Sequence, residues 1–308
     1  FIFKDFWFLA GSWILGDIAW TFYSGAGSAW SIDALNYSKK KSKIVNLISK
    51  GYFFEKGGHI IGGLIGLVIV SINFSFIWLF VSVSNVFMLF VVAKYMEERN
   101  FKPEKVPHNY FMKSLIKFKE SFSFIIHKKN KQLRVLLFGK FLGVLAISAF
   151  FVGMPLLFTE SLNVSPNQLS GIISVVAALT IISPLIAGKI AQNSGIKKSM
   201  IFSIFIVGIS ILVFALSQSV ILAIVAFSVF QLSLSAVDVI EDSASHHEFD
   251  SKIRASLGSL SSIIWGVSFS ISVFLTGIFI SIFGVIPTII ASGILIFLEG
   301  IVYLFRLK

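Results

Sequence analysis

The segment from Ala255 to Leu298 reads ASLGSLSSIIWGVSFSISVFLTGIFISIFGVIPTIIASGILIFL, which is 44 residues without Asp, Glu, Lys or Arg. A helix needs about 20 apolar residues to cross the hydrocarbon core of a bilayer, because each residue advances it by about 1.5 Å. The segment is therefore long enough for two spanning helices. Phe283-Gly284 marks a turn between them, and Pro287 is expected to open the second helix.

The same pattern occurs twice more in the chain. Residues 57–93 form 37 uncharged residues and residues 199–237 form 39, and each segment again has turn residues near its middle. Together with the single spans, this predicts an all-α, polytopic helical membrane protein with nine spanning helices. Their expected bounds are roughly 6–30, 52–71, 75–95, 135–158, 168–189, 199–217, 219–239, 255–281 and 285–305.

The composition agrees with this interpretation and excludes several classes of protein. The 308 residues are 56% hydrophobic and 13% charged, whereas soluble domains carry about 25% charged residues. The mean hydropathy of +0.89 excludes a cytosolic or secreted enzyme. In so apolar a chain, the net charge of +11 does not indicate nucleic-acid binding. The chain has no cysteine, so cysteine-bound metals and disulfides are excluded, and we expect no metal or other cofactor.

Lysine and arginine residues gather on one side of the nine alternating spans. Of the 26 basic residues, only Lys4 falls on the other side. Cytoplasmic loops collect Lys and Arg, so the basic side and the C-terminus are predicted to be cytoplasmic. The chain is thus predicted to be a multi-pass protein of the cell membrane.

The longest hydrophilic stretch, residues 96–134, has three predicted helices before it and six after it. A transporter built from two six-helix halves would carry such a linker at its centre. We therefore expect residues 1–95 to be the remnant of an N-terminal bundle, 96–134 a cytoplasmic basic linker, and 135–308 a C-terminal six-helix bundle. Three missing N-terminal helices would also account for the absent initiator Met, so the chain is interpreted as an N-terminally truncated fragment.

The linker contains apolar residues at helical spacing with lysines between them. These residues are Phe111, Leu115, Phe118, Phe122 and Ile125. The pattern predicts an amphipathic helix on the anionic inner leaflet, where each surface lysine contributes about 1 kcal/mol of attraction. A basic tether of this kind is a simpler interpretation than a nucleic-acid site.

Two of the predicted helices carry polar residues along one face. They are Asp17, Thr21, Ser24 and Ser28 in the first helix, and Ser228, Gln231, Ser235 and Asp238 in the seventh. An ionised Asp at the bilayer centre costs about 2.5 to 3.5 kcal/mol on insertion scales, so it needs a reason to be there. We interpret the two faces as walls of one water-filled cavity. The alternative is that the hydroxyls bond to neighbouring helices and that Asp17 pairs with an unseen partner.

Other polar and small residues within the predicted spans have simpler interpretations. Gly58, Gly62 and Gly66 share one helix face and are expected to pack closely against another helix. Glu299 lies toward the cytoplasmic end of the last span, where packing, snorkelling to the lipid edge and function remain equally open. The acidic and histidine-rich segment 241–250 is expected to be a solvated loop.

Three stretches resemble the major facilitator superfamily. Residues 18–35, IAWTFYSGAGSAWSIDAL, resemble the fourth-helix signature of its drug-exporter-like members. Residues 188–198, GKIAQNSGIKK, resemble the second-half copy of its cytoplasmic gating motif, and 254–259, RASLGS, resemble the start of its eleventh helix. The resemblance covers the whole chain, as helices four to twelve of the two-bundle (6+6) fold.

The sequence also departs from the family pattern at several positions. Gln192 stands where the loop motif has an acidic residue, and Ser12 stands near the place of the Arg that many proton-coupled exporters carry in the fourth helix. Asp17 is an addition. The glycine-rich second helix is similar to the family's antiporter motif but lacks its proline.

The resemblance and the polar faces together predict a secondary active transporter that moves a small molecule by alternating access. The resemblance implies proton-coupled export. Asp17, Thr21, Ser24, Gln231 and Ser235 are expected to line the substrate cavity, with Asp17 exchanging the proton. The expected cytoplasmic gate comprises Asp33, Asp238, Lys252 and Arg254, with Gly188 and Gly195 of the loop motif.

The expected partners are a small-molecule substrate, protons and the lipid bilayer, with no nucleic acid, and the chain is expected to be a monomer. The alternative function is a membrane-embedded sensor or a lipid-handling enzyme without transport activity. That alternative would rest on His246, His247 and Glu248 with nearby acidic residues, because neighbouring histidines and carboxylates can form an active site.

Overall fold

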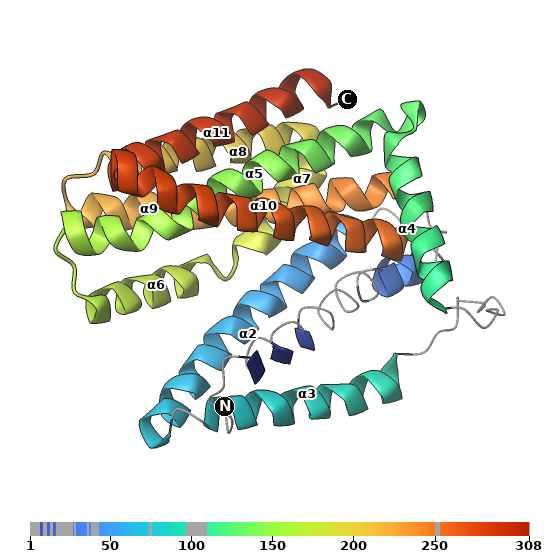
Figure 1. The fold of residues 1–308 in the computed structure, drawn as a ribbon, viewed down its shortest axis with the longest axis horizontal. Coiled ribbons are helices and arrows are strands. Elements are labelled where there is room, and N and C mark those ends of the chain that lie inside the picture. Colours follow the sequence, from blue (N-terminus) through green and yellow to red (C-terminus); the bar gives the residue numbers. More distant parts are fainter. Residues whose placement is uncertain are drawn as a thin grey trace.

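The computed structural model describes residues 7–8, 11–12, 15–16, 27, 29–35, 37, 43–73, 76–96, 110–249 and 253–307. Within these ranges the chain is helical and has no strand, which confirms the predicted all-α class (Figure 1). The long helices are α2 (Ile44–Ile72), α3 (Phe76–Tyr95), α4 (Tyr110–Ile126), α5 (Lys131–Leu156), α6 (Pro166–Thr180), α7 (Ser183–Ser194), α8 (Ile196–Ala215), α9 (Val220–Glu248), α10 (Arg254–Phe283) and α11 (Val285–Arg306).

Each predicted span after the first has a counterpart among these helices. Six helices in the described part of the chain are long and apolar enough to cross a membrane, and a seventh is added if α6 and α7 form one span bent by 40°. Most of the expected first span, 6–30, lies outside the described residues. The predicted division of the chain at residues 95 and 134 stays a prediction.

The helices from α5 to α11 pack into one bundle around a core of phenylalanine rings. Phe150 of α5 lies 4.3 Å from Phe230 of α9 and 5.2 Å from Phe214 of α8, centroid to centroid. Glycines let the helices approach closely, as at Gly153, where an added Cβ would come within 2.7 Å of Ile289. Close packing of this kind holds helices together in lipid, where burial from water cannot.

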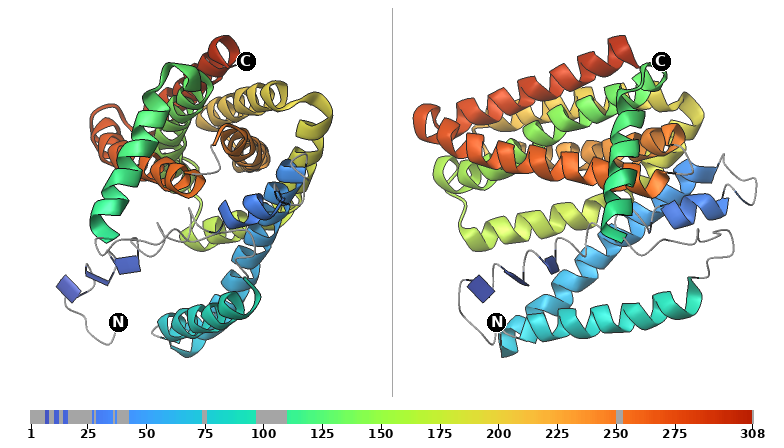
Figure 2. Two further views of the ribbon diagram at one scale, coloured as in Figure 1. Left: turned by 90° about the vertical axis from the view of Figure 1, so that its right-hand side faces the viewer. Right: turned by 45° about the vertical axis from the view of Figure 1, so that its right-hand side comes forward.

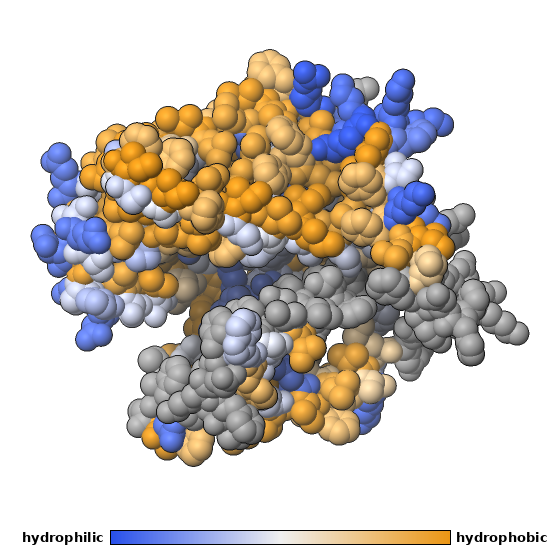
Figure 3. Space-filling view, in the orientation of Figure 1, coloured by the Kyte–Doolittle hydropathy of each residue, from blue (hydrophilic) through white to orange (hydrophobic). Residues whose placement is uncertain are grey.

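The outer surface is suited to a bilayer. Figure 3 shows a broad hydrophobic face on the bundle, with hydrophilic residues concentrated at its two ends. α3 has no buried residue within the described chain. Apolar side chains on such surfaces face lipid tails rather than water.

The helix predicted within the linker is observed as α4, with Leu115, Phe118 and Phe122 exposed on it. α4 lies across one end of the bundle, near the C-terminus (Figures 1 and 2). The connection between α7 and α8 lies at the same end (Figure 2), and Lys197 and Lys198 follow it in the first turn of α8. We call this end of the molecule the basic end.

α2 contacts the bundle near the basic end and leaves it toward the other end. It packs against α7 and α9, and all views show its last turns lying well apart from α6 (Figures 1 and 2). α2 and the bundle therefore meet at the basic end. The polar residues at this meeting place form the candidate site.

Candidate functional site

Figure 3 shows hydrophilic atoms at the back of a hollow between the bundle and the helices below it. Of the predicted cavity residues, Gln231 and Ser235 lie on α9. Gln231 is half-buried, and Ser235 is only 2% exposed. The Ser235 hydroxyl has no hydrogen-bond partner in the described part of the chain. Asp17, Thr21 and Ser24 lie outside the described residues.

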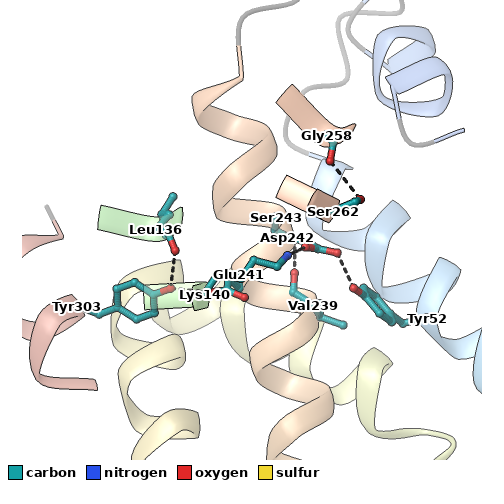
Figure 4. A network of polar contacts seen from close by, with 10 residues as sticks. All are labelled: Tyr52, Leu136, Lys140, Val239, Glu241, Asp242, Ser243, Gly258, Ser262 and Tyr303. Atoms are coloured by element: carbon teal, nitrogen blue, oxygen red, sulfur yellow. Dashed lines mark hydrogen bonds and ion pairs between the residues drawn. The ribbon is translucent and has the colours of Figure 1, made fainter. Parts of the chain in front are cut away.

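A chain of polar contacts joins α2 to the bundle at the basic end (Figure 4). The Lys140 ammonium of α5 donates to Asp242 Oδ1 of α9 at 3.1 Å, and this ion pair is largely shielded from solvent. The Tyr52 hydroxyl of α2 donates to Asp242 Oδ2 at 2.5 Å. Asp242 therefore receives two hydrogen bonds, one from each side of the meeting place. Hydrogen bonds to a charged acceptor are worth about 1.5 to 3 kcal/mol each.

A second contact group lies deeper in the bundle. Glu241 of α9 is 7% exposed, and its Oε1 lies 2.5 Å from the hydroxyl of Tyr303 on α11. The same hydroxyl lies 3.0 Å from the carbonyl oxygen of Leu136 on α5. Tyr303 is fully buried, and an added Cβ on Gly139 would overlap its ring. The tyrosine thus holds three helices together around one carboxyl group.

Glu299 of α11 is buried beside this group. Its side chain is 2% exposed, and an added Cβ on Gly143 would lie 2.5 Å from its Oε2. It is in electrostatic range of Glu241, Asp238 and Lys140, but it forms no ion pair within the described chain. Of the three interpretations left open by the sequence, snorkelling to the lipid edge is therefore wrong.

Asp238 lies one helical turn before Asp242 on α9 and is half-buried. It is in electrostatic range of Lys140 and of Lys56 on α2. The residue predicted for the cytoplasmic gate thus lies next to the contacts between α2 and the bundle.

Two other predicted gate residues form an ion pair. The Arg254 guanidinium, at the first turn of α10, donates to the carboxylate of Asp33. It also donates to the carbonyl oxygen of Phe249 at 3.3 Å. Arg254 is 5% exposed and joins residues that are far apart in the sequence. Lys252 lies outside the described residues.

Both glycines of the predicted loop motif occupy demanding positions. Gly188 of α7 faces Ser49 of α2, and an added Cβ would overlap the Ser49 hydroxyl and come 2.8 Å from its Cβ. Gly195 separates α7 from α8 with a φ of +86°, a conformation that favours glycine over other residues. The motif therefore combines a tight helix contact with a sharp turn.

The three glycines predicted to pack on α2 have open surroundings. A Cβ added at Gly58, Gly62 or Gly66 would meet no described atom within 4 Å. Their packing role stays a prediction, because the first predicted helix is largely outside the described residues.

The predicted solvated loop at 241–250 is wrong for most of its length. α9 continues to Glu248, well beyond the expected end at 239. His246 is buried and its ring lies 5.1 Å from the Phe249 ring. The polar residues were mistaken for a loop because a bilayer-length helix was expected to end before them. In the described residues no group of His, Asp and Glu is arranged to hold a metal ion.

Sequence reasoning missed the contributions of Lys140, Tyr52 and Tyr303. Lys140 lies within the otherwise apolar span predicted at 135–158. An ionisable residue inside a membrane span is costly and indicates a functional site or a paired partner, so this rule would have found it. The two tyrosines carry no comparable signal, because tyrosine is common at membrane boundaries.

A comparison with protein families bears on this arrangement. The model of the Major Facilitator Superfamily matches residues 136–308, which is more than half of the chain. The chain belongs to this superfamily. It is therefore a secondary transporter with several membrane-spanning helices, and the alternative of a lipid-handling enzyme is set aside.

Among solved structures, the fucose:proton symporter FucP of E. coli is similar to this superfamily member. The TM-score is 0.59 at 14% sequence identity, and the match covers 94% of this chain and 82% of that chain. At this level of identity the likeness concerns the fold alone. A comparison with curated proteins found no match.

Proposed function

We propose that this transporter exports a small molecule in exchange for protons, by alternating access, with the basic end on the cytoplasmic side. The substrate binds between the first predicted helix and α9, with Asp17, Thr21 and Ser24 on one wall and Gln231 and Ser235 on the other. Asp33, Asp238, Lys252 and Arg254 form the gate on the cytoplasmic side, together with the tight contact at Gly188.

The observation that carries this proposal is the contact chain from Tyr52 through Asp242 to Lys140. Taking charged groups out of water costs several kcal/mol per ion, and replacing such pairs by apolar residues is often neutral or stabilising. Polar contacts between two packed helices therefore add little to the stability of a permanent interface. They suit an interface that forms and breaks, because their groups can be solvated again when the helices separate.

The arrangement of α2 supports a particular step of the cycle. α2 contacts α7 and α9 near the basic end and diverges from α6 at the other end. With the basic end cytoplasmic, we assign this arrangement to the state that is closed to the cytoplasm. Alternating access then requires the Tyr52–Asp242 and Arg254–Asp33 contacts to break when the opposite state forms.

The choice of protons and of export has separate supports. Asp238 lies on α9 and Asp17 lies in the first predicted span, and carboxyl groups in spanning helices can bind and release protons. FucP, whose fold is similar, is named as a proton symporter. Export rests on residues 18–35, which resemble the drug-exporter-like branch of the superfamily. The 34 phenylalanines suit an amphipathic or aromatic substrate, although exposure to the bilayer also favours phenylalanine.

Transport assays with the full chain in inverted membrane vesicles test the proposal, with ethidium and rhodamine 6G as probes. Acidifying the vesicle interior should drive dye accumulation, and collapsing the pH gradient should release the dye. The variant Asp242→Asn should reduce this transport, whereas Glu160→Gln, a carboxyl outside the contact chain, should not. Dye leaving acidic vesicles together with protons would instead establish symport.

A conformational assay covers the case in which neither dye is a substrate. The chain has no native cysteine, so two spin labels can be placed at the basic end, at Lys50→Cys and Lys189→Cys. Both residues are exposed and each follows a residue of the Ser49–Gly188 contact. Alternating access predicts two distance populations whose ratio responds to pH. One fixed distance at every pH would contradict it.

A further inference from the structure

We propose that Glu241 is a proton-binding site of the C-terminal bundle, distinct from Asp17, and that Tyr303 is its positioning residue. The proposal deepens the proposed function, since it assigns a second group that could exchange a proton during transport. It is argued from the hydrogen bonds around one buried hydroxyl, from the surrounding charges and from the packing.

The first argument is the number of hydrogens available to Tyr303. Its hydroxyl carries one hydrogen, yet it lies 2.5 Å from Glu241 Oε1 and 3.0 Å from the Leu136 carbonyl oxygen. A carbonyl oxygen can only accept. Two separate hydrogen bonds, one at each contact, require Glu241 to be a carboxylic acid that donates to the tyrosine oxygen while the tyrosine donates to Leu136. A distance of 2.5 Å lies at the short end for a bond between two oxygens.

The second argument is the charge around Glu241. Glu299 of α11 faces the same region, Asp238 and Asp242 flank Glu241 on α9, and Lys140 is the cation from α5. That cation already pairs with Asp242 at 3.1 Å. On α2, Tyr52 bonds to Asp242 and Lys56 is in range of Asp238. A buried, ionised and uncompensated carboxylate costs several kcal/mol. Binding a proton neutralises Glu241 and removes this cost.

The packing between α5 and α11 holds Tyr303 and Glu299 in place. The Tyr303 ring is pressed against Gly139, and the Glu299 carboxyl against Gly143, one turn further along α5. Either glycine would overlap its partner if it carried a Cβ. This close packing between α5 and α11 fixes the Tyr303 hydroxyl at its contact with Glu241.

The proton exchange balances without any further reactant. When Glu241 releases its proton to water, the Tyr303 hydroxyl turns and donates to the carboxylate instead. Leu136 then loses the tyrosine hydrogen bond, and a new negative charge lies next in sequence to Asp242. Two carboxylates then compete for Lys140, which is part of the contact chain to α2. Proton occupancy at Glu241 is thereby linked to the contact between the two parts of the transporter.

Infrared spectroscopy of the full chain in nanodiscs tests this assignment without requiring transport. The carbonyl stretch of a protonated carboxylic acid should be present in the wild type and should disappear as the pH is raised. Glu241→Gln should remove one such band. Glu299→Gln, the buried neighbour, and Glu160→Gln, away from the site, should both leave that band in place.

Tyr303→Phe provides a second variant in which Glu241 itself is unchanged. Because it removes the hydrogen-bond acceptor of the acid, the band of Glu241 should shift in frequency, and the pH at which it disappears should change. A band that is lost in Glu299→Gln and kept in Glu241→Gln would overturn the assignment, as would the absence of any protonated carboxyl. Dye transport without this band would refute the proton site and leave the proposed function standing.

Discussion

Replacing Gly188 by alanine is expected to weaken the closed gate at the basic end. The added Cβ would lie 2.8 Å from the Ser49 Cβ and would overlap the Ser49 hydroxyl. That hydroxyl is held in place by its hydrogen bond to the Val45 carbonyl oxygen, at 2.6 Å. Carbon atoms in contact prefer about 3.5 to 4.0 Å, so α2 and α7 must separate by roughly 1 Å or the serine must give up its bond.

The size of the effect follows from the cost of overpacking. Inserting a methyl group into a filled contact costs about 1 to 3 kcal/mol. In the proposed cycle, the state that is open to the cytoplasm does not make this contact. The cost therefore falls only on the state that is closed to the cytoplasm. A cost of about 2 kcal/mol corresponds to an approximately 30-fold lower ratio of closed to open molecules.

Spin-label distances between Lys50→Cys and Lys189→Cys measure this ratio directly. Gly171→Ala on α6 is the matched control, since no described atom lies within 4 Å of its added Cβ. Adding Ser49→Gly to Gly188→Ala should restore the closed population, because it removes both atoms that clash. The reasoning is refuted if Gly188→Ala leaves the distances like those of Gly171→Ala, or if Ser49→Gly has no rescuing effect.

Three further predictions concern other parts of the molecule. Lys140→Met should lower the free energy of unfolding of the purified protein by about 1 to 3 kcal/mol, because it removes the cation that pairs with the partly buried carboxylate of Asp242; adding Asp242→Asn should recover part of the loss, and a double variant as unstable as the single one would contradict this explanation. Asp17→Asn should abolish proton-driven dye flux at normal expression, and undiminished flux would remove Asp17 from the coupling role. Lys119→Gln on α4 with Lys129→Gln in the turn that follows it should weaken the attraction of this segment to anionic nanodiscs by about 2 kcal/mol, as measured by a membrane-sensitive fluorophore on α4; equal signals in zwitterionic and anionic nanodiscs would show that charge does not position this helix.

The spanning helices could be predicted from the sequence because the bilayer imposes a simple rule on length and polarity. The turn at Phe283-Gly284 shows this well, since α10 ends at Phe283 and α11 begins at Val285. The rule failed where a helix continues beyond the apolar region. The segment 241–250 is expected from the sequence to be a solvated loop, although up to Phe249 much of it is surrounded by protein and not by solvent.

The candidate site was predictable only in part, because a sequence shows which residues are costly but not which ones meet. Asp33 and Arg254 were both assigned to the gate, and their pairing appears only in the folded chain. Glu299 remained ambiguous, because its burial depends on Gly143 of another helix. Tyr303 could not be identified at all, since its role depends on Leu136 and Glu241 arriving at the same hydroxyl from two different helices.

The 40° break between α6 and α7 has a consequence for how the two entrances can evolve. α7 carries the glycine that contacts α2, while α6 extends toward the opposite end of the molecule. A straight helix would transmit every change of tilt from one end of the span to the other. Because the span is broken at its centre, substitutions that adapt α6 to a new substrate can leave the contact between Gly188 and Ser49 unchanged.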